Sequence, residues 1–132
     1  NLMSGEAVTT NTLSMWRSDD GMIHIKVLAH AKMSLADAKE GNRLAWDLSD
    51  GKRRPRFCDY TEIHSQDAEC RAYYASQETS KTCLACAILI GSPVSRVIGN
   101  FYLGLNRPST PTRLFTSKPQ AIEWLRGFPD DS

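Results

Sequence analysis

The stretch that decides the fold is residues 83–106, CLACAILIGSPVSRVIGNFYLGLN. Its first part, Cys83 to Ile90, is an apolar run without a charge, which is typical of a strand that is covered on both faces. Gly91 interrupts the run and Ser92 is a favourable N-cap. Pro93 suits the first position of a helix, where its missing N–H costs nothing. The stretch therefore predicts a buried strand, a tight turn and a helix.

The predicted helix carries two different stripes. Its apolar side chains recur at helical spacing and form one stripe: Val94, Val97, Ile98, Phe101 and Leu105. A second stripe holds the smaller residues Ser95 and Gly99 together with Leu103. Asn106 can take the left-handed conformation that ends a helix, and Pro108 prevents continuation.

Upstream of this stretch, the sequence predicts a β-hairpin followed by a helix. Residues 12–17 and 22–29 alternate between apolar and polar, and the turn residues Ser18–Gly21 separate them. Ser34 is an N-cap for a helix over residues 35–48. The basic residues 52–56 that follow are interpreted as a solvated connector before a strand, with an anion site as the alternative.

The other elements follow the same reasoning. They are a strand over residues 56–61, a helix over 66–80 capped by Ser65, a short strand over 113–116, and a final helix that Ser117 caps and Gly127 ends. The element order is β-β-α-β-α-β-α-β-α, which predicts an α/β domain with a mixed sheet covered by about four helices. We expect one domain over residues 12–128, preceded by a flexible lead-in over residues 1–11.

Composition and charge exclude several functional classes. The chain has 132 residues, of which 41% are hydrophobic, so it can form one domain with a single core. Its 16 basic and 15 acidic side chains leave a net charge of +1, which argues against a nucleic-acid binder. No apolar run approaches the roughly 20 residues that span a bilayer. Residues 1–12 are polar and lack the pattern of a signal peptide, so we expect a cytoplasmic protein.

The four cysteines do not predict a metal or redox site. Cys83 and Cys86 have the spacing of a redox or zinc pair, but they lie inside an apolar strand, where residues three apart point to opposite faces. They are interpreted as buried structural thiols. The histidines, His24, His30 and His64, lack metal-ligand spacing. We therefore expect neither a metal nor a cofactor.

The element order and the second half of the chain carry a family resemblance. The motifs are Ser92-Pro93, Ser95-Arg96-Val97-Ile98-Gly99-Asn100-Phe101, Asn106-Arg107-Pro108, Pro111-Thr112-Arg113-Leu114-Phe115-Thr116 and Ala121-Ile122-Glu123-Trp124-Leu125. With these motifs the chain resembles the STAS / SpoIIAA-like family, and in particular small uncharacterised bacterial proteins of the STAS/SEC14-like class. The resemblance implies a SpoIIAA-like fold.

The resemblance also implies a position for a regulatory switch. Antagonists of the STAS type carry an Asp-Ser-Ser-Gly or similar tetrapeptide, in which phosphorylation of the second hydroxyl residue breaks partner binding. Here the tetrapeptide becomes His64-Ser65-Gln66-Asp67, so the phosphoacceptor position is Gln66, which has no hydroxyl. The usual switch is therefore not expected, and whether Ser65 is phosphorylated stays open.

The candidate interaction or anion site combines this loop with the helix of residues 93–105. Its residues are Ser65, Gln66, Ser92, Ser95, Arg96, Asn100 and Tyr102. The start of that helix offers backbone N–H groups, hydroxyls and a guanidinium to an anion, or these groups simply cap the helix. The stripe of small residues favours close packing within the chain or a dimer or partner face. Phe101 and Tyr102 cannot both point inward, and exposed aromatic residues often anchor interfaces.

These observations predict a non-enzymatic regulatory module that binds another protein, with a homodimer as one form of that interaction. No catalytic residues are predicted, because the sequence lacks a nucleophile elbow, a Gly-rich dinucleotide motif and a P-loop. The alternative is a small-ligand or lipid carrier, which follows only from the SEC14-like relatives and requires an apolar cavity.

Overall fold

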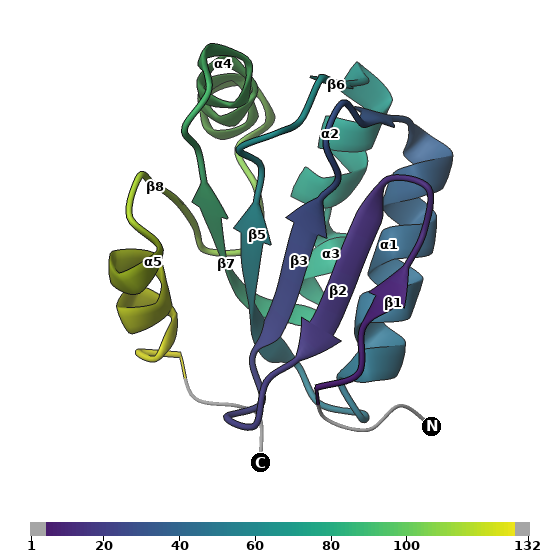
Figure 1. The fold of residues 1–132 in the computed structure, drawn as a ribbon, viewed down its shortest axis with the longest axis vertical. Coiled ribbons are helices and arrows are strands. Elements are labelled where there is room, and N and C mark those ends of the chain that lie inside the picture. The colour runs from purple at the N-terminus through teal and green to yellow at the C-terminus, as the bar shows by residue number, and fades with distance from the viewer. Residues whose placement is uncertain (1–4, 129–132) are drawn as a thin grey trace.

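A six-stranded mixed sheet forms the centre of the protein in a computed structural model that describes residues 5–128 (Figure 1). The strand order in the sheet is β1-β2-β3-β5-β7-β8. The bounds are β1 (Val8–Thr9), β2 (Leu13–Arg17), β3 (Ile23–Val27), β5 (Arg54–Asp59), β7 (Cys83–Leu89) and β8 (Thr112–Phe115). β1, β2 and β3 are antiparallel neighbours, whereas β3, β5, β7 and β8 run parallel. A separate parallel pair joins β4 (Lys32–Met33) to β6 (Ser65–Gln66).

Helices cover both faces of the sheet. The bounds are α1 (Leu35–Leu48), α2 (Ala68–Ala75), α3 (Gln77–Ser80), α4 (Pro93–Phe101), the π-helix η1 (Tyr102–Asn106) and α5 (Lys118–Leu125). Figure 1 shows α1, α2 and α3 behind the sheet, α5 on the other face over β5 and β7, and α4 at the upper end of the strands. This architecture confirms the predicted mixed α/β fold.

Two hydrophobic clusters lie on the two faces of the sheet. The larger one packs the sheet against α1 and α2 and includes Leu13, Ile23 and Ile88. The smaller one lies under α5 and includes Phe57, Phe115, Ala121 and Leu125. None of the helices in residues 5–128 has the length and apolar character needed to cross a membrane.

The first half of the chain follows its local sequence signals. The hairpin of β2 and β3 turns at residues 18–21, and α1 has the predicted bounds. Ser34 and Asp37 form a reciprocal capping box at the start of α1. β1, which pairs with β2, lies within the stretch expected to be a lead-in, and residues 1–4 are outside the described residues.

The helix predicted over residues 66–80 is wrong in its bounds. Ser65 is not its cap, because Ser65 and Gln66 pair with Lys32 and Met33 in the small sheet. The helix begins at Ala68 after Asp67, and it breaks at Ser76 before the short α3. Strand pairing over a long sequence separation therefore overrides the local capping signal.

The basic stretch 52–56 is not a solvated connector, because its second half forms the start of β5. Arg54 and Arg56 are both buried. Arg54 donates from Nε to the Ser49 carbonyl at 2.7 Å, so backbone oxygens replace the water that its guanidinium loses.

Cys83 and Cys86 lie on the same side of β7, contrary to the prediction from strand alternation. Arg54 pairs with Cys83 and Arg56 with Cys86, so β7 contains one residue more than β5 over this interval. This irregularity shifts the alternation by one residue, and both thiols line the same cavity.

The face of α4 that turns inward is the stripe of small residues. Ser95 and Gly99 are buried, and a Cβ at Gly99 would lie 3.0 Å from Leu114 Cδ2 of β8. The small stripe therefore packs within the chain and lets α4 approach β8 closely. On the apolar stripe only Ile98 is buried, and Val94, Val97, Phe101 and Leu105 are exposed. The left-handed residue after the helix is Arg107, at φ 50°, rather than Asn106, because η1 extends the helical path to Asn106.

Candidate functional site

An open groove of about 460 Å3 lies between β6 and α4, near the carboxyl ends of β5 and β7. We call it the α4 groove. It is lined by His64, Ser65, Gln66, Arg71, Pro93, Val94, Val97, Ile98 and Phe101. Open α/β sheets commonly bind their ligands at the carboxyl ends of their strands.

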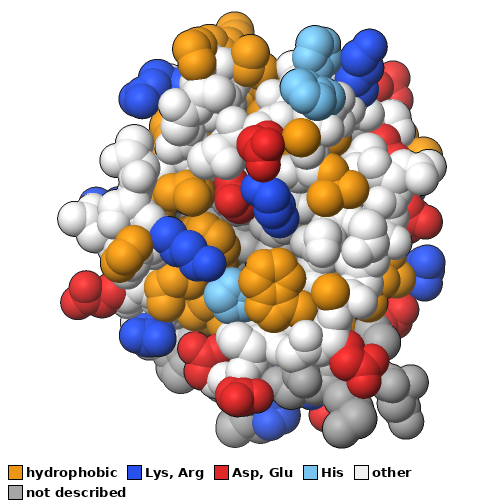
Figure 2. Space-filling model, viewed as in Figure 1, with side chains coloured by type: hydrophobic (Ala, Val, Ile, Leu, Met, Phe, Trp, Pro, Cys, Tyr) orange, Lys and Arg blue, Asp and Glu red, His pale blue; other side chains and the backbone are white. Residues whose placement is uncertain are grey.

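The α4 side of the groove is apolar and exposed. Val94 is 44% exposed, Val97 53% and Phe101 48%, and Leu105 continues the stripe at 72%. Figure 2 shows hydrophobic side chains gathered at the top of the molecule, over α4, with histidine side chains beside them. Single exposed apolar residues are ordinary, whereas large contiguous apolar patches are typical of interaction surfaces.

The polar groups of the groove carry positive or no charge. Arg71 is half-buried and donates from Nη1 to the Gln66 carbonyl, while His64 is exposed. Arg96 is exposed on α4 itself. Within the described part of the chain, no aspartate or glutamate lines the groove. The groove therefore suits a partner surface that combines apolar and acidic groups.

The two sequence-predicted residues of β6 lie in this groove but differ in role. Ser65 is half-exposed, so its hydroxyl is at the surface. Gln66 is buried, and its Nε2 donates to the Tyr60 hydroxyl at 3.3 Å. Gln66, which aligns with the phosphoacceptor of STAS-type antagonists in the sequence resemblance, thus turns toward the interior.

Ser92 and Ser95 cap the start of α4, which is one of the two roles that the sequence left open for them. Ser92 Oγ accepts from the Ser95 N–H at 3.0 Å. Ser95 Oγ accepts from the N–H groups of Gly91 and Ser92 at 3.0 and 2.9 Å. Since Ser95 is fully buried, its hydroxyl is not available to a ligand.

We expect Ser95→Ala to lower the free energy of unfolding by about 2 kcal/mol, because two backbone N–H groups lose their acceptor. Urea denaturation followed by circular dichroism measures this change. Asn100→Ala on the exposed side of the same helix is the control, with an expected change within about 0.5 kcal/mol. Equal effects of the two substitutions would contradict the capping role.

The other predicted residues are distributed over different environments. Arg96 and Asn100 are exposed on α4, whereas Tyr102 is buried and faces an interior cavity. The seven predicted residues therefore do not form one site. The exposed apolar residues of α4 were missed as a surface, because a periodic apolar stripe ordinarily indicates the buried face of a helix.

Asp59, at the end of β5, is held by its neighbours as an ionised carboxylate. Burial raises the pKa of this carboxyl group. Hydrogen bonds from the Thr61 hydroxyl and N–H, together with the charge of Lys26, lower the pKa by more than burial raises it, so the net shift is downward. Lys26 Nζ lies 3.5 Å from Asp59 and 2.9 Å from Glu62. A carboxyl group with a lowered pKa is not suited to act as a general acid at neutral pH.

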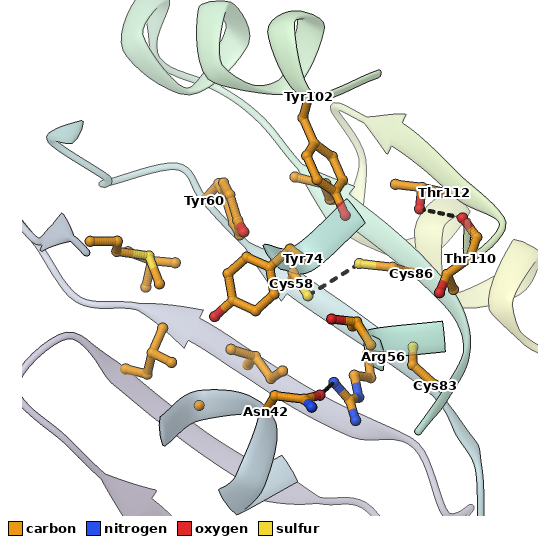
Figure 3. A pocket seen from close by; sticks show the side chains of 17 residues that line it. Asn42, Arg56, Cys58, Tyr60, Tyr74, Cys83, Cys86, Tyr102, Thr110 and Thr112 are labelled. Atoms are coloured by element: carbon orange, nitrogen blue, oxygen red, sulfur yellow. Dashed lines mark hydrogen bonds between the residues drawn. The ribbon is translucent and has the colours of Figure 1, made fainter. Parts of the chain in front are cut away.

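A second concave feature, the polar cavity, lies inside the protein between the sheet and the helices α1 and α2 (Figure 3). Its volume is about 50 Å3. Its polar lining comprises Asn42, Arg56, Cys58, Tyr60, Tyr74, Thr79, Cys83, Cys86, Tyr102, Thr110 and Thr112, and Leu13, Ile25, Val27, Met33, Gly41 and Ile88 complete it. The sequence did not reveal this cavity, because its polar residues come from six separated segments.

Raised pKa values keep Cys83, Cys86 and the phenols around the cavity in their neutral forms. Burial raises the pKa of Cys83 to about 11 and raises the pKa of the Tyr102 phenol. The pKa of Cys86 is also raised, first by its contact with Cys58, whose Sγ is 3.4 Å away, and then by burial. Across residues 5–128, no three His, Cys, Asp or Glu side chains gather in a group that could hold a metal ion.

Comparisons with known proteins identify the fold and a family. A family model described as "Domain of unknown function (DUF7793)" matches residues 15–129. A solved structure of an uncharacterised protein from Shewanella loihica PV-4, described as from the DUF3478 family with a SpoIIAA-like fold, is 16% identical. The likeness covers 95% of this chain and 99% of that one, with a TM-score of 0.56, which confirms the predicted SpoIIAA-like fold. No curated protein gives a significant match.

Proposed function

Because the chain belongs to the DUF7793 family, whose function is unknown, we propose a function from its own surface: a non-enzymatic module that binds a partner protein through the α4 groove. The observation that carries this proposal is the exposure of the apolar stripe of α4. Val94, Val97 and Phe101 line the groove while the small residues of the same helix face the core. A helix that exposes its apolar stripe is stabilised when a partner covers that stripe.

The charges around the α4 groove indicate which chemical class of partner it can bind. The groove combines apolar side chains with the cationic Arg71, and the exposed Arg96 lies on α4. Among residues 5–128, no carboxylate lines the groove. A partner segment with apolar and acidic side chains complements this surface. A symmetric dimer through the groove would bring two like-charged surfaces together, which disfavours a second copy as the occupant.

The polar cavity does not support the alternative function, which is a carrier of a lipid or another small ligand. Pockets for drug-sized ligands measure about 300–1,000 Å3. The polar cavity measures about 50 Å3, which is too small for a lipid chain.

Site-specific photo-crosslinking in an extract of the source organism tests the proposal. A photoreactive residue replaces Val97, and in a matched control it replaces Trp46, which is also exposed but lies on α1. We expect position 97 to form an adduct with one partner protein, identified by mass spectrometry, and position 46 not to form it. The crosslinked segment should contain apolar and acidic residues.

Three outcomes contradict the proposal. They are the absence of an adduct from a correctly folded protein, the same adducts from both positions, and an adduct at position 97 that contains only a second copy of this chain. The last result would replace the proposed partner with self-association, which sedimentation velocity measures independently.

A further inference from the structure

Arg56 is a buried cation that forms no ion pair with any of residues 5–128. Its side chain extends from β5 into the polar cavity and the residue is 4% exposed. Nη1 donates to Asn42 Oδ1 at 2.9 Å, and Nη2 donates to the Thr82 carbonyl and hydroxyl at 3.2 and 3.1 Å. Among residues 5–128, no carboxylate lies within ion-pair distance of this guanidinium.

The neutral hydrogen-bond partners do not neutralise this charge. An arginine keeps its proton in proteins, so burial does not discharge it. A buried charge that lacks an opposite charge destabilises the folded state, and an anion in the same space would offset this cost. Among the lining residues within 5–128, Arg56 is the one Lys, Arg, His, Asp or Glu, and the raised pKa values of Cys83, Cys86 and Tyr102 keep those groups protonated.

Unsatisfied donors face the same space. Arg56 Nε and Thr110 Oγ1 are buried without a hydrogen-bond partner, and both residues line the cavity. The Tyr60 hydroxyl accepts a bond from Gln66 Nε2, which leaves its O–H available to donate. Figure 3 shows Tyr60 and Tyr102 directing their hydroxyl ends into the cavity from the side opposite Arg56.

We infer that the polar cavity binds a small monovalent anion, a halide or a small carboxylate such as formate, with Arg56 as its counter-ion. The cavity volume of about 50 Å3 exceeds the roughly 10–15 Å3 that one water requires. The lining offers positive charge and O–H donors, and the described residues that form it include no carboxylate, which favours an anion over a cation. This site is separate from the α4 groove and does not depend on the proposed function.

The test is an NMR titration of the full chain with sodium formate, in which sodium sulfate keeps the ionic strength constant. The reporter is the Arg56 Nε–H signal in a 1H–15N spectrum. We expect a saturable shift of this signal with formate, competition by chloride, and no effect of sulfate, which is larger and doubly charged. Arg56→Met should bind formate at least about tenfold more weakly, as measured by saturation-transfer NMR, because a charge-assisted bond is lost.

Arg43→Met is the matched control, since Arg43 is exposed on α1 and pairs with Asp47. It should leave the titration unchanged. A linear or absent response of the Arg56 signal in the wild type overturns the inference, as does equal formate binding by both variants. If Arg56→Met does not fold, the wild-type titration alone decides, because the signal reports directly on the site.

Discussion

The Val97→Asp variant is expected to bind the partner protein at least about 100-fold more weakly than the wild type does. Its fold should stay intact. Val97 lies in the middle of the exposed stripe of α4 and lines the groove. An aspartate there puts an unpaired carboxylate into an interface that otherwise buries apolar side chains, and a factor of 100 corresponds to about 2.7 kcal/mol. Because position 97 is already 53% exposed, the free energy of unfolding should change by less than about 0.5 kcal/mol. Isothermal titration calorimetry with the crosslinked partner measures the affinity.

Trp46→Ser is the control for this variant, because it also removes an exposed apolar side chain but on α1, away from the groove. It should leave the affinity for the partner unchanged. Equal loss of binding in both variants would indicate a nonspecific effect of surface hydrophobicity. Unchanged binding by a folded Val97→Asp variant would rule out the α4 groove as the interface.

Leu125→Ala is expected to lower the free energy of unfolding by about 3 kcal/mol. Leu125 is fully buried at the end of α5, in the smaller hydrophobic cluster with Phe57, Phe115 and Ala121. This cluster attaches α5 to the sheet, so the cavity left by the lost methyl groups weakens that face. Guanidinium denaturation followed by tryptophan fluorescence measures the change, because Trp124 packs at the edge of the same cluster.

Ile122→Ala provides the comparison within α5. Ile122 is only partly buried against the same cluster, so its truncation should cost about 1 kcal/mol. A cost of Leu125→Ala below that of Ile122→Ala would contradict the packing of α5 described here. A change in the denaturant dependence without a change in midpoint would instead indicate an altered unfolded state.

The candidate site was predictable from the sequence only in part. Ser65, Gln66 and the helix after Pro93 were identified as its components, and the structure places Ser65 and Gln66 beside that helix in the α4 groove. The helix residues that line the groove are other ones than those predicted. The roles of individual residues were not predictable. Ser95 supplies a hydrogen-bond acceptor to its own chain and Gln66 turns inward, because each polar group near the core must find a partner there.

The sequence by itself determined the types and order of the main elements and the bounds of α1. It did so because the hairpin turn, the Ser34 cap, the apolar run of β7 and the Pro93 start are local signals that act within a few residues. Only the tertiary structure decided which stripe of α4 faces the core, and that Arg56 points into a cavity rather than into solvent. Both depend on contacts between residues distant in the chain. Gly99 must approach Leu114 closely, and the irregular pairing of β5 with β7 sets which side chains share a face.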